Sequence, residues 1–100
     1  MRRVIPYIKI ESYKCADTEK LFRDVLVPRF RSIERLTRCK LHYLHRTRTL
    51  DDLKQPPDNR LEALKENRKV QYSIRINDQW RICFMWTDGD TYDVEIVEYD

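Results

Sequence analysis

Three stretches in which apolar and polar side chains alternate strictly, at residues 71–77, 80–87 and 92–97, limit the possible folds more than any other feature of the chain. Alternation with many β-branched and aromatic residues is typical of strands that bury one face. Turn-forming residues separate the stretches, with Asn and Asp in the first gap and Asp-Gly-Asp in the second. The segment therefore predicts an antiparallel sheet with one apolar and one polar face.

The length of the second turn decides which residues of the sheet face each other. Directly opposed residues of an antiparallel pair lie on the same face. A two-residue loop would set Ile82 opposite Glu95 and mix the faces, whereas a three-residue loop, residues 88–90, sets Ile82 opposite Ile96. We therefore expect the three-residue loop, which also sets Arg81 opposite Val97.

The same parity places Arg75 opposite or near Arg81 on the polar face. Like charges that face each other across a strand pair are destabilising. A bound anion such as phosphate would relieve the repulsion. The simpler alternative is that Glu95 or Glu98 neutralises the arginines, and without knowledge of the fold it is the interpretation that we favour.

The composition excludes several classes of function. A chain of 100 residues has the length of one domain, so we expect a single domain over residues 1–100. The only glycine cannot form a glycine-rich phosphate loop. The net charge of +3 permits a nucleic-acid partner. Three scattered cysteines suit a reducing compartment, and no apolar run is long enough to span a membrane. We expect a soluble cytoplasmic protein.

The first half of the chain predicts an opening strand and two helices. Residues 4–12 alternate in the manner of a strand. Asp17 or Thr18 would cap a short helix that runs to Leu26 and that Pro28 ends.

A longer helix is predicted over residues 30–46, and one more helical turn over residues 50–53 would begin after a Thr49 cap. The inward side of the long helix is expected to consist of Phe30, Ile33, Leu36 and Leu44, with Leu41 and Tyr43 flanking them. The resulting order β-α-α-β-β-β, with the helices before most of the sheet, is an α+β pattern.

Cys39, His42 and His45 on this helix raise the possibility of a zinc site. Their i, i+3, i+6 spacing moves around the helix axis, and no second ligand cluster follows. Solvent-facing or helix-end histidines are the interpretation that we favour. A nucleophilic pair of Cys83 with a histidine stays open, but nothing in the sequence indicates an activated thiolate.

The same helix has a row of arginines on its outward side, Arg31, Arg35 and Arg38. Their i, i+4, i+7 spacing could follow the phosphates of a nucleic acid. Such a row is more often a solvated helix face, and Glu34 could neutralise part of its charge.

The strongest candidate set comes from the sheet region, where basic and aromatic residues are interleaved. It consists of Lys65, Arg68, Lys69, Arg75, Arg81, Tyr92 and Tyr99. Such a set suits RNA, because guanidinium groups hold phosphates and aromatic rings stack on bases. RNA can be cut without a metal when its own 2′-OH attacks, given a base, an acid and a cation for the transition state. Base or acid could come from Glu62, Glu98, Tyr99 or Asp100. Solubility or protein binding remains an alternative role for these arginines.

The segment from Asn59 to Asp100 resembles the C-terminal half of HigB-type toxins in the RelE/ParE superfamily. The likeness is most specific at QYSIRINDQWRICF and DVEIVEY. Two earlier segments, SYKCADTEKLF and TLDDLKQPPDNRLEALK, also resemble the GraT-like branch of this family. The resemblance implies two N-terminal helices packed on an antiparallel sheet. It also implies a cofactor-independent, ribosome-dependent mRNA endonuclease with the ribosome, mRNA and a HigA-like helix-turn-helix antitoxin as partners.

The resemblance assigns roles to individual residues. The basic residue of the family's L-x-x-L-K segment falls on Lys65, and the Arg of its N-W-R-I-x-F segment falls on Arg81, which would stabilise the phosphate. The terminal aromatic residue falls on Tyr99, with Glu98 at the preceding acid. Apart from the resemblance, the interleaved basic and aromatic pattern makes Arg68, Lys69 and Arg75 the candidates to hold the RNA.

Two positions depart from the family. Some members have His where this chain has Glu62, and the family usually closes with His where this chain has Asp100. Asp lacks the near-neutral pKa and the donor capacity of an imidazole. Either Glu62 and Asp100 act as acid and base, or the chain is a weak or inactive module that binds its antitoxin and RNA and contributes to operon autoregulation. A ParE-like topoisomerase poison is a third alternative.

Overall fold

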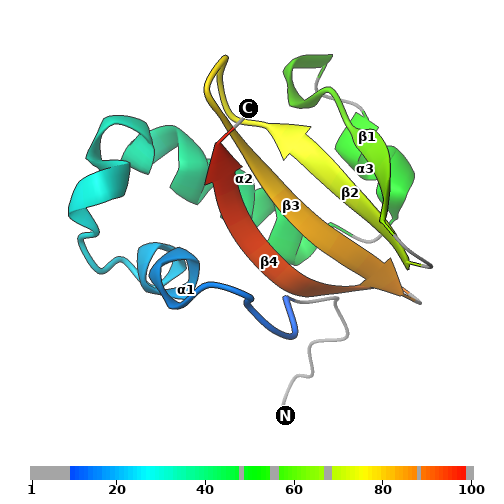
Figure 1. Cartoon of the computed structure of the whole chain (residues 1–100), viewed down its shortest axis with the longest axis horizontal. Coiled ribbons are helices and arrows are strands. Elements are labelled where there is room, and N and C mark those ends of the chain that lie inside the picture. The colour runs from blue at the N-terminus through cyan, green and yellow to red at the C-terminus, as the bar shows by residue number, and fades with distance from the viewer. Residues whose placement is uncertain (1–9, 48, 55–56, 67–68, 88, 99–100) are drawn as a thin grey trace, which may run out of the picture.

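The computed structural model describes residues 10–47, 49–54, 57–66, 69–87 and 89–98, with the backbone alone at residues 57, 65, 66, 69 and 70. The helices are α1 (Ala16–Phe22), the 3-10 helix η1 (Pro28–Ile33), α2 (Glu34–Arg46), α3 (Leu50–Lys54) and the 3-10 helix η2 (Pro57–Asn59). The strands β1 (Glu62–Glu66), β2 (Lys69–Arg75), β3 (Trp80–Thr87) and β4 (Asp90–Glu98) form one antiparallel sheet in the order β1-β2-β3-β4. Figure 1 shows α2 behind this sheet and α1 beside β4.

The predicted fold class, an α+β fold with helices packed on an antiparallel sheet, is confirmed. The opening strand is not: most of its residues lie outside the described part of the chain, and residues 11–12 are not in a strand. Ile10 and Tyr13 make only single parallel bridges to β4. The fourth strand is instead β1, which the sequence did not indicate, because Leu, Ala, Lys and Glu favour a helix and lack β-branching.

The expected pairing of β3 with β4 is confirmed, but the expected loop is wrong. Ile82 faces Ile96 and Arg81 faces Val97. Only two residues separate Thr87 from its partner Asp90, and the register shifts by one between Cys83 and Met85. The additional residue is therefore a bulge within β4, near Asp93, whose φ is +52°. The bulge returns the apolar side chains to one face.

The first two predicted helices have different boundaries in the structure. α1 ends at Phe22, four residues before the expected end, and Asp24 follows in a left-handed conformation with φ of +67°. Its N-cap is Cys15 and not Asp17 or Thr18. Thr18 is buried, and its hydroxyl accepts a hydrogen bond from the Ile96 backbone N–H at 3.1 Å.

The predicted long helix is two elements, the 3-10 helix η1 followed by α2. The change of helix type at Ile33 rotates the faces relative to a continuous α-helix. Leu41 is fully buried, whereas Leu36, which was expected to point inward, is 45% exposed. The core between the layers contains Leu21, Phe30, Leu41, Leu44, Leu53, Ile74, Ile82, Phe84, Val94 and Ile96.

α3 begins as predicted, at a Thr49 cap. The Asp52 N–H donates to the Thr49 hydroxyl at 3.2 Å, and the Thr49 N–H donates to the Asp52 carboxylate at 3.3 Å. Leu53, at the inner side of this short helix, is fully buried. α3 and η2 thereby bring the chain to the start of β1.

The open edge of β4 is covered by the segment that precedes α1. Backbone N–H groups of Glu11 and Lys14 donate to carbonyls of β4 at 2.7 and 2.9 Å, and the Val94 N–H donates to the Ser12 carbonyl at 3.2 Å. Together with the Thr18 hydroxyl, these contacts occupy backbone groups that an exposed edge strand would offer to another chain.

Candidate nucleic-acid interface

The face of the sheet that points away from the helices has two arginines directly opposite each other. Arg75 on β2 pairs with Arg81 on β3, as predicted. The neighbouring pair on these strands, Ile74 with Ile82, is buried on the opposite face. Because successive side chains of a strand alternate between faces, Arg75 and Arg81 lie on the outer face. Two positive charges are thereby placed on facing residues, and we call this outer surface around Arg75 and Arg81 the arginine face.

A cavity of about 230 Å³ lies beside Arg75 and is lined by Arg60, Glu62, Arg75 and Asp78. The Arg75 guanidinium donates to the Asp78 carboxylate. For Arg75 the neutralising carboxylate is therefore Asp78, and not Glu95 or Glu98 as the simpler alternative supposed.

Those two glutamates contact other residues. Glu95 lies 3.6 Å from the Lys14 ammonium, and Glu98 accepts a hydrogen bond from the Gln79 amide at 2.7 Å. The Asp78 side chain is 99% exposed, so its ion pair with Arg75 is a weak surface interaction. An anion that binds Arg75 more strongly can replace the Asp78 carboxylate.

The strand pairing brings Glu62 to this cavity. Glu62 on β1 faces Ser73 on β2, two positions from Arg75 and on the same face. Two carboxylates, of Glu62 and Asp78, and two guanidinium groups, of Arg60 and Arg75, thus line one cavity. Chemically, such a cavity can hold a phosphodiester on the guanidiniums and present a proton acceptor to a hydroxyl beside it.

Arg60 and Asp78 complete the cavity, and neither was a candidate from the sequence. Arg60 lies between η2 and β1 with a φ of +43°, a loop conformation that no periodicity predicts. Asp78 belongs to the turn between β2 and β3, three residues after Arg75. That spacing in a tight turn is the one signal by which Asp78 could have been found.

Buried hydrogen bonds position the start of β1. The Lys40 ammonium of α2 donates to the Asn59 amide oxygen at 2.6 Å, and the Asn59 amide donates to the Leu53 carbonyl at 3.1 Å. Burial lowers the pKa of Lys40, and although Asp58 opposes this shift, the nearby charge of Arg75 lowers it further. The helical layer is therefore electrostatically linked to the arginine face.

Other predicted site residues have fixed places on the strands or lie outside the described part. Lys65 on β1 pairs with Val70, Lys69 on β2 pairs with Glu66, and the side chains of these two lysines are not described. Glu98 pairs with Trp80 at the end of β4, and Tyr92 pairs with Met85. Arg68, Tyr99 and Asp100 lie outside the described residues.

The two alternative sites considered from the sequence, a zinc site and a cysteine–histidine pair, are not formed by the described residues. No group of three or more His, Cys, Asp and Glu side chains there could hold a metal ion. His42 and His45 both lie against the Phe22 ring, at centroid distances of 4.6 and 5.1 Å, and His45 Nδ1 accepts a hydrogen bond from a backbone N–H. Cys83 is buried on β3, on the outer face of the sheet, whereas the histidines belong to α2 on the other side.

Helices packed on a four-stranded antiparallel sheet form a small α+β fold that is consistent with the RelE-like toxin class. A family model described as the RelE-like toxin of the type II toxin-antitoxin system HigB matches residues 14–99. The chain belongs to this HigB-like toxin family. None of its helices in the described ranges is long and apolar enough to cross a membrane.

Two curated proteins are similar to parts of the chain. Toxin HigB-1 of Vibrio cholerae is 45% identical over 58 residues, which cover 58% of this chain and 61% of that protein. An uncharacterised protein of Haemophilus influenzae is 33% identical over 51 residues, which cover 51% of this chain and 50% of that protein. The matches therefore span less than two thirds of the length of these relatives.

Proposed function

We propose that this chain is the toxin of a type II toxin-antitoxin pair and cuts mRNA on the ribosome by attack of the RNA's own 2′-OH. The observation that carries the proposal is the directly opposed pair Arg75 and Arg81 on the outer face, where Arg75 lines one cavity with the carboxylate of Glu62. The membership in the HigB-like family supports it. A helix-turn-helix antitoxin of the HigA kind would be the partner that neutralises the toxin.

The proposed reaction needs three chemical roles. Arg81, with Lys65, stabilises the negative charge that develops on the phosphorane in the transition state. The carboxylate of Glu62 or Asp100 accepts the proton of the 2′-OH. A second acidic side chain, for which Glu98 is one candidate, protonates the 5′ oxygen of the leaving group. Tyr99 stacks on a base next to the cut. Arg75, with Arg68 and Lys69, holds the neighbouring phosphates.

The arginine face also explains why an RNA phosphate would bind there. The two guanidinium groups belong to facing residues, and they can donate charge-assisted hydrogen bonds to adjacent phosphates of the RNA. Asp78 would release Arg75 when the phosphate arrives, since this carboxylate is almost fully exposed. Arg60 would provide a further guanidinium at the rim of the same cavity.

The test is cleavage of a defined mRNA by the purified chain, with and without translating ribosomes, mapped by primer extension. We expect cuts only with ribosomes. Arg81→Ala should lower the cleavage rate by about a hundredfold or more, because it removes a transition-state charge partner. Its circular dichroism spectrum and melting temperature should remain close to those of the parent. A folded Arg81→Ala protein that cuts at the parental rate would refute the role of Arg81.

The position of Asp100 favours one alternative function, a catalytically weak or inactive module that binds its antitoxin and RNA and contributes to operon autoregulation. The same assay separates the two. If the parent chain does not cut and Asp100→His restores cutting, then the rest of the site is intact and Asp100 is the cause of the inactivity. If neither protein cuts while antitoxin binding persists, the binding-module function is correct.

A further inference from the structure

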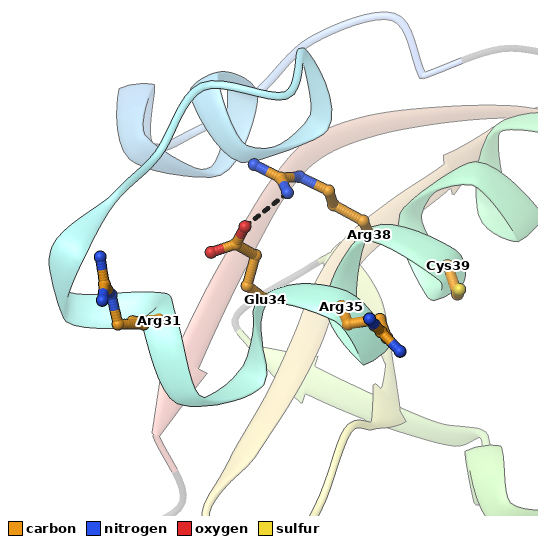
Figure 2. A pocket seen from close by; sticks show the side chains of 5 residues that line it. All are labelled: Arg31, Glu34, Arg35, Arg38 and Cys39. Atoms are coloured by element: carbon orange, nitrogen blue, oxygen red, sulfur yellow. Dashed lines mark hydrogen bonds and ion pairs between the residues drawn. The ribbon is translucent and has the colours of Figure 1, made fainter.

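A second charged hollow, of about 470 Å³, lies on the outward surface of the helical layer. It is lined by Arg31, Glu34, Arg35, Arg38 and Cys39 (Figure 2). These residues come from η1 and α2, on the side of the sheet opposite to the arginine face. We call it the helix groove.

Arg38 is a structural member of the helix groove. Its guanidinium donates to the Glu34 carboxylate at 2.6 Å and to the backbone carbonyls of Leu21 and Val25 at 2.8 and 3.2 Å, and it lies 3.4 Å from the Asp24 carboxylate. These contacts join α2 to the loop that follows α1. Arg38 therefore serves to join these elements, and we assign it no role in binding a ligand.

Arg31 and Arg35 differ from Arg38. Both are exposed, and neither forms a hydrogen bond or an ion pair with another residue in the described part of the chain. In Figure 2 their side chains lie on the two sides of Glu34, whose carboxylate points to Arg38. The prediction that Glu34 would neutralise part of the row is thus confirmed for Arg38, and two guanidinium groups remain available to an external anion.

The surroundings of the helix groove favour a protein over a nucleic acid. Glu34 and Asp24 both contact Arg38 and interrupt the positive row, so the helix groove has two separate available cations and not the continuous positive surface that a phosphate backbone follows. Val25, whose carbonyl is bonded to Arg38, and Leu26 are 47% and 51% exposed. Both belong to the loop between α1 and η1 that Arg38 joins to α2, and exposed aliphatic side chains on that loop, together with two available arginines, suit a segment with both carboxylates and apolar side chains.

We propose that the helix groove is a docking site for an acidic segment of a protein partner, with its carboxylates on Arg31 and Arg35 and an apolar side chain against Val25 and Leu26. The partner is the antitoxin, and this identification rests on the proposed function. Because the helix groove and the arginine face lie on opposite layers, the two interactions use separate residues.

The test compares two variants of the full chain for binding to the purified cognate antitoxin. The variant Arg31→Glu with Arg35→Glu reverses both available charges. The control is Arg46→Glu, which reverses an exposed charge at the other end of the same helix. We expect the groove variant to weaken binding by about tenfold or more and to remove most of its dependence on salt, with Arg46→Glu within about twofold of the parent. Equal affinity of all three proteins would overturn the proposal.

Cys39 provides an independent readout, because it lines the helix groove and is exposed, whereas Cys83 is buried. In a Cys15→Ser background, bound antitoxin should slow the alkylation of Cys39 by iodoacetamide by about tenfold or more, measured by mass spectrometry. An unchanged rate would contradict docking in the groove.

Separate variants distinguish this inference from the proposed function. Arg31→Glu with Arg35→Glu should leave ribosome-dependent cleavage intact, and Arg81→Ala should leave antitoxin binding intact. Loss of cleavage with normal antitoxin binding in the groove variant would assign the helix groove to RNA and overturn the proposal. If the parent does not cut mRNA at all, antitoxin binding by the groove variant still decides the inference.

Discussion

At the scale of single residues, the exposed carboxylate of Asp78 would compete with any anion that approaches Arg75 on the outer face. The alternation of side chains along the two strands was enough to predict that Arg75 is paired with Arg81, because directly opposed residues lie on the same side of a sheet. The partner of Arg75 could not be predicted in the same way. Asp78 lies in a turn and Arg60 in a loop with φ of +43°, and the alternation that identifies strands contains no information about either.

The competition leads to a prediction for Asp78→Asn. Removal of this carboxylate frees Arg75, so affinity for a short single-stranded RNA should rise by about two- to fivefold, the equivalent of one exposed ion pair. Fluorescence anisotropy at two salt concentrations measures it. Asp51→Asn, which makes the same charge change at an exposed ion pair on α3, is the matched control and should change affinity less. Weaker binding by Asp78→Asn would show that the carboxylate assists the site.

At the scale of elements, the β3–β4 hairpin shows what an apolar pattern determines and what it leaves open. Burial requires that Ile82 face Ile96, and the alternation was sufficient to predict that pairing. The pattern cannot tell whether the additional residue lies in the loop or within a strand, since both solutions give the same pure faces. The structure has it as a bulge near Asp93, and Gly89, with φ of +86°, lies in the short loop.

The bulge predicts how substitutions at Asp93 affect stability. A β-branched residue tolerates positive φ poorly, so Asp93→Val should lower the free energy of unfolding by about 1–2 kcal/mol. Asn adopts the left-handed region more readily, so Asp93→Asn should remain within about 0.5 kcal/mol of the parent. Urea denaturation followed by tryptophan fluorescence measures both. Similar losses for the two variants would mean that the backbone conformation at Asp93 does not limit stability.

At the scale of the whole molecule, one connection joins the start of the described chain to its last strand. Residues 10–14 bond along β4, and α1 follows with Thr18 bonded to the same strand. Tyr13 lies within this connection against Phe22, at a centroid distance of 6.1 Å. Such contacts between distant parts of the sequence depend on the packed structure, and for that reason the local pattern predicted a strand here where only single bridges form.

Tyr13 gives the connection a predictable response to high pH. Burial, aided by Glu19 and opposed by Arg23, raises the pKa of Tyr13 from 10.0 to about 12. The unfolded chain therefore loses the phenol proton first, and stability should fall as pH rises from about 10 to 12. The stability of the Tyr13→Phe variant should fall less steeply over this pH range. Because the other tyrosines are present in both proteins, the difference between the two curves reports on Tyr13. Urea midpoints between pH 8 and pH 12 measure the difference. Parallel curves would contradict the assignment.

The opposed arginines also have an evolutionary consequence. Under the proposed function, Arg75 and Arg81 bind phosphate from the outer face of the sheet, so replacing either with a neutral residue removes that charge and leaves the apolar core intact. If the chain has the proposed toxic activity, mutants that escape this toxicity would not have to misfold. Their proteins would accumulate as well-folded, inactive copies that still occupy the antitoxin, and selection against toxicity would enrich decoys as well as damaged genes.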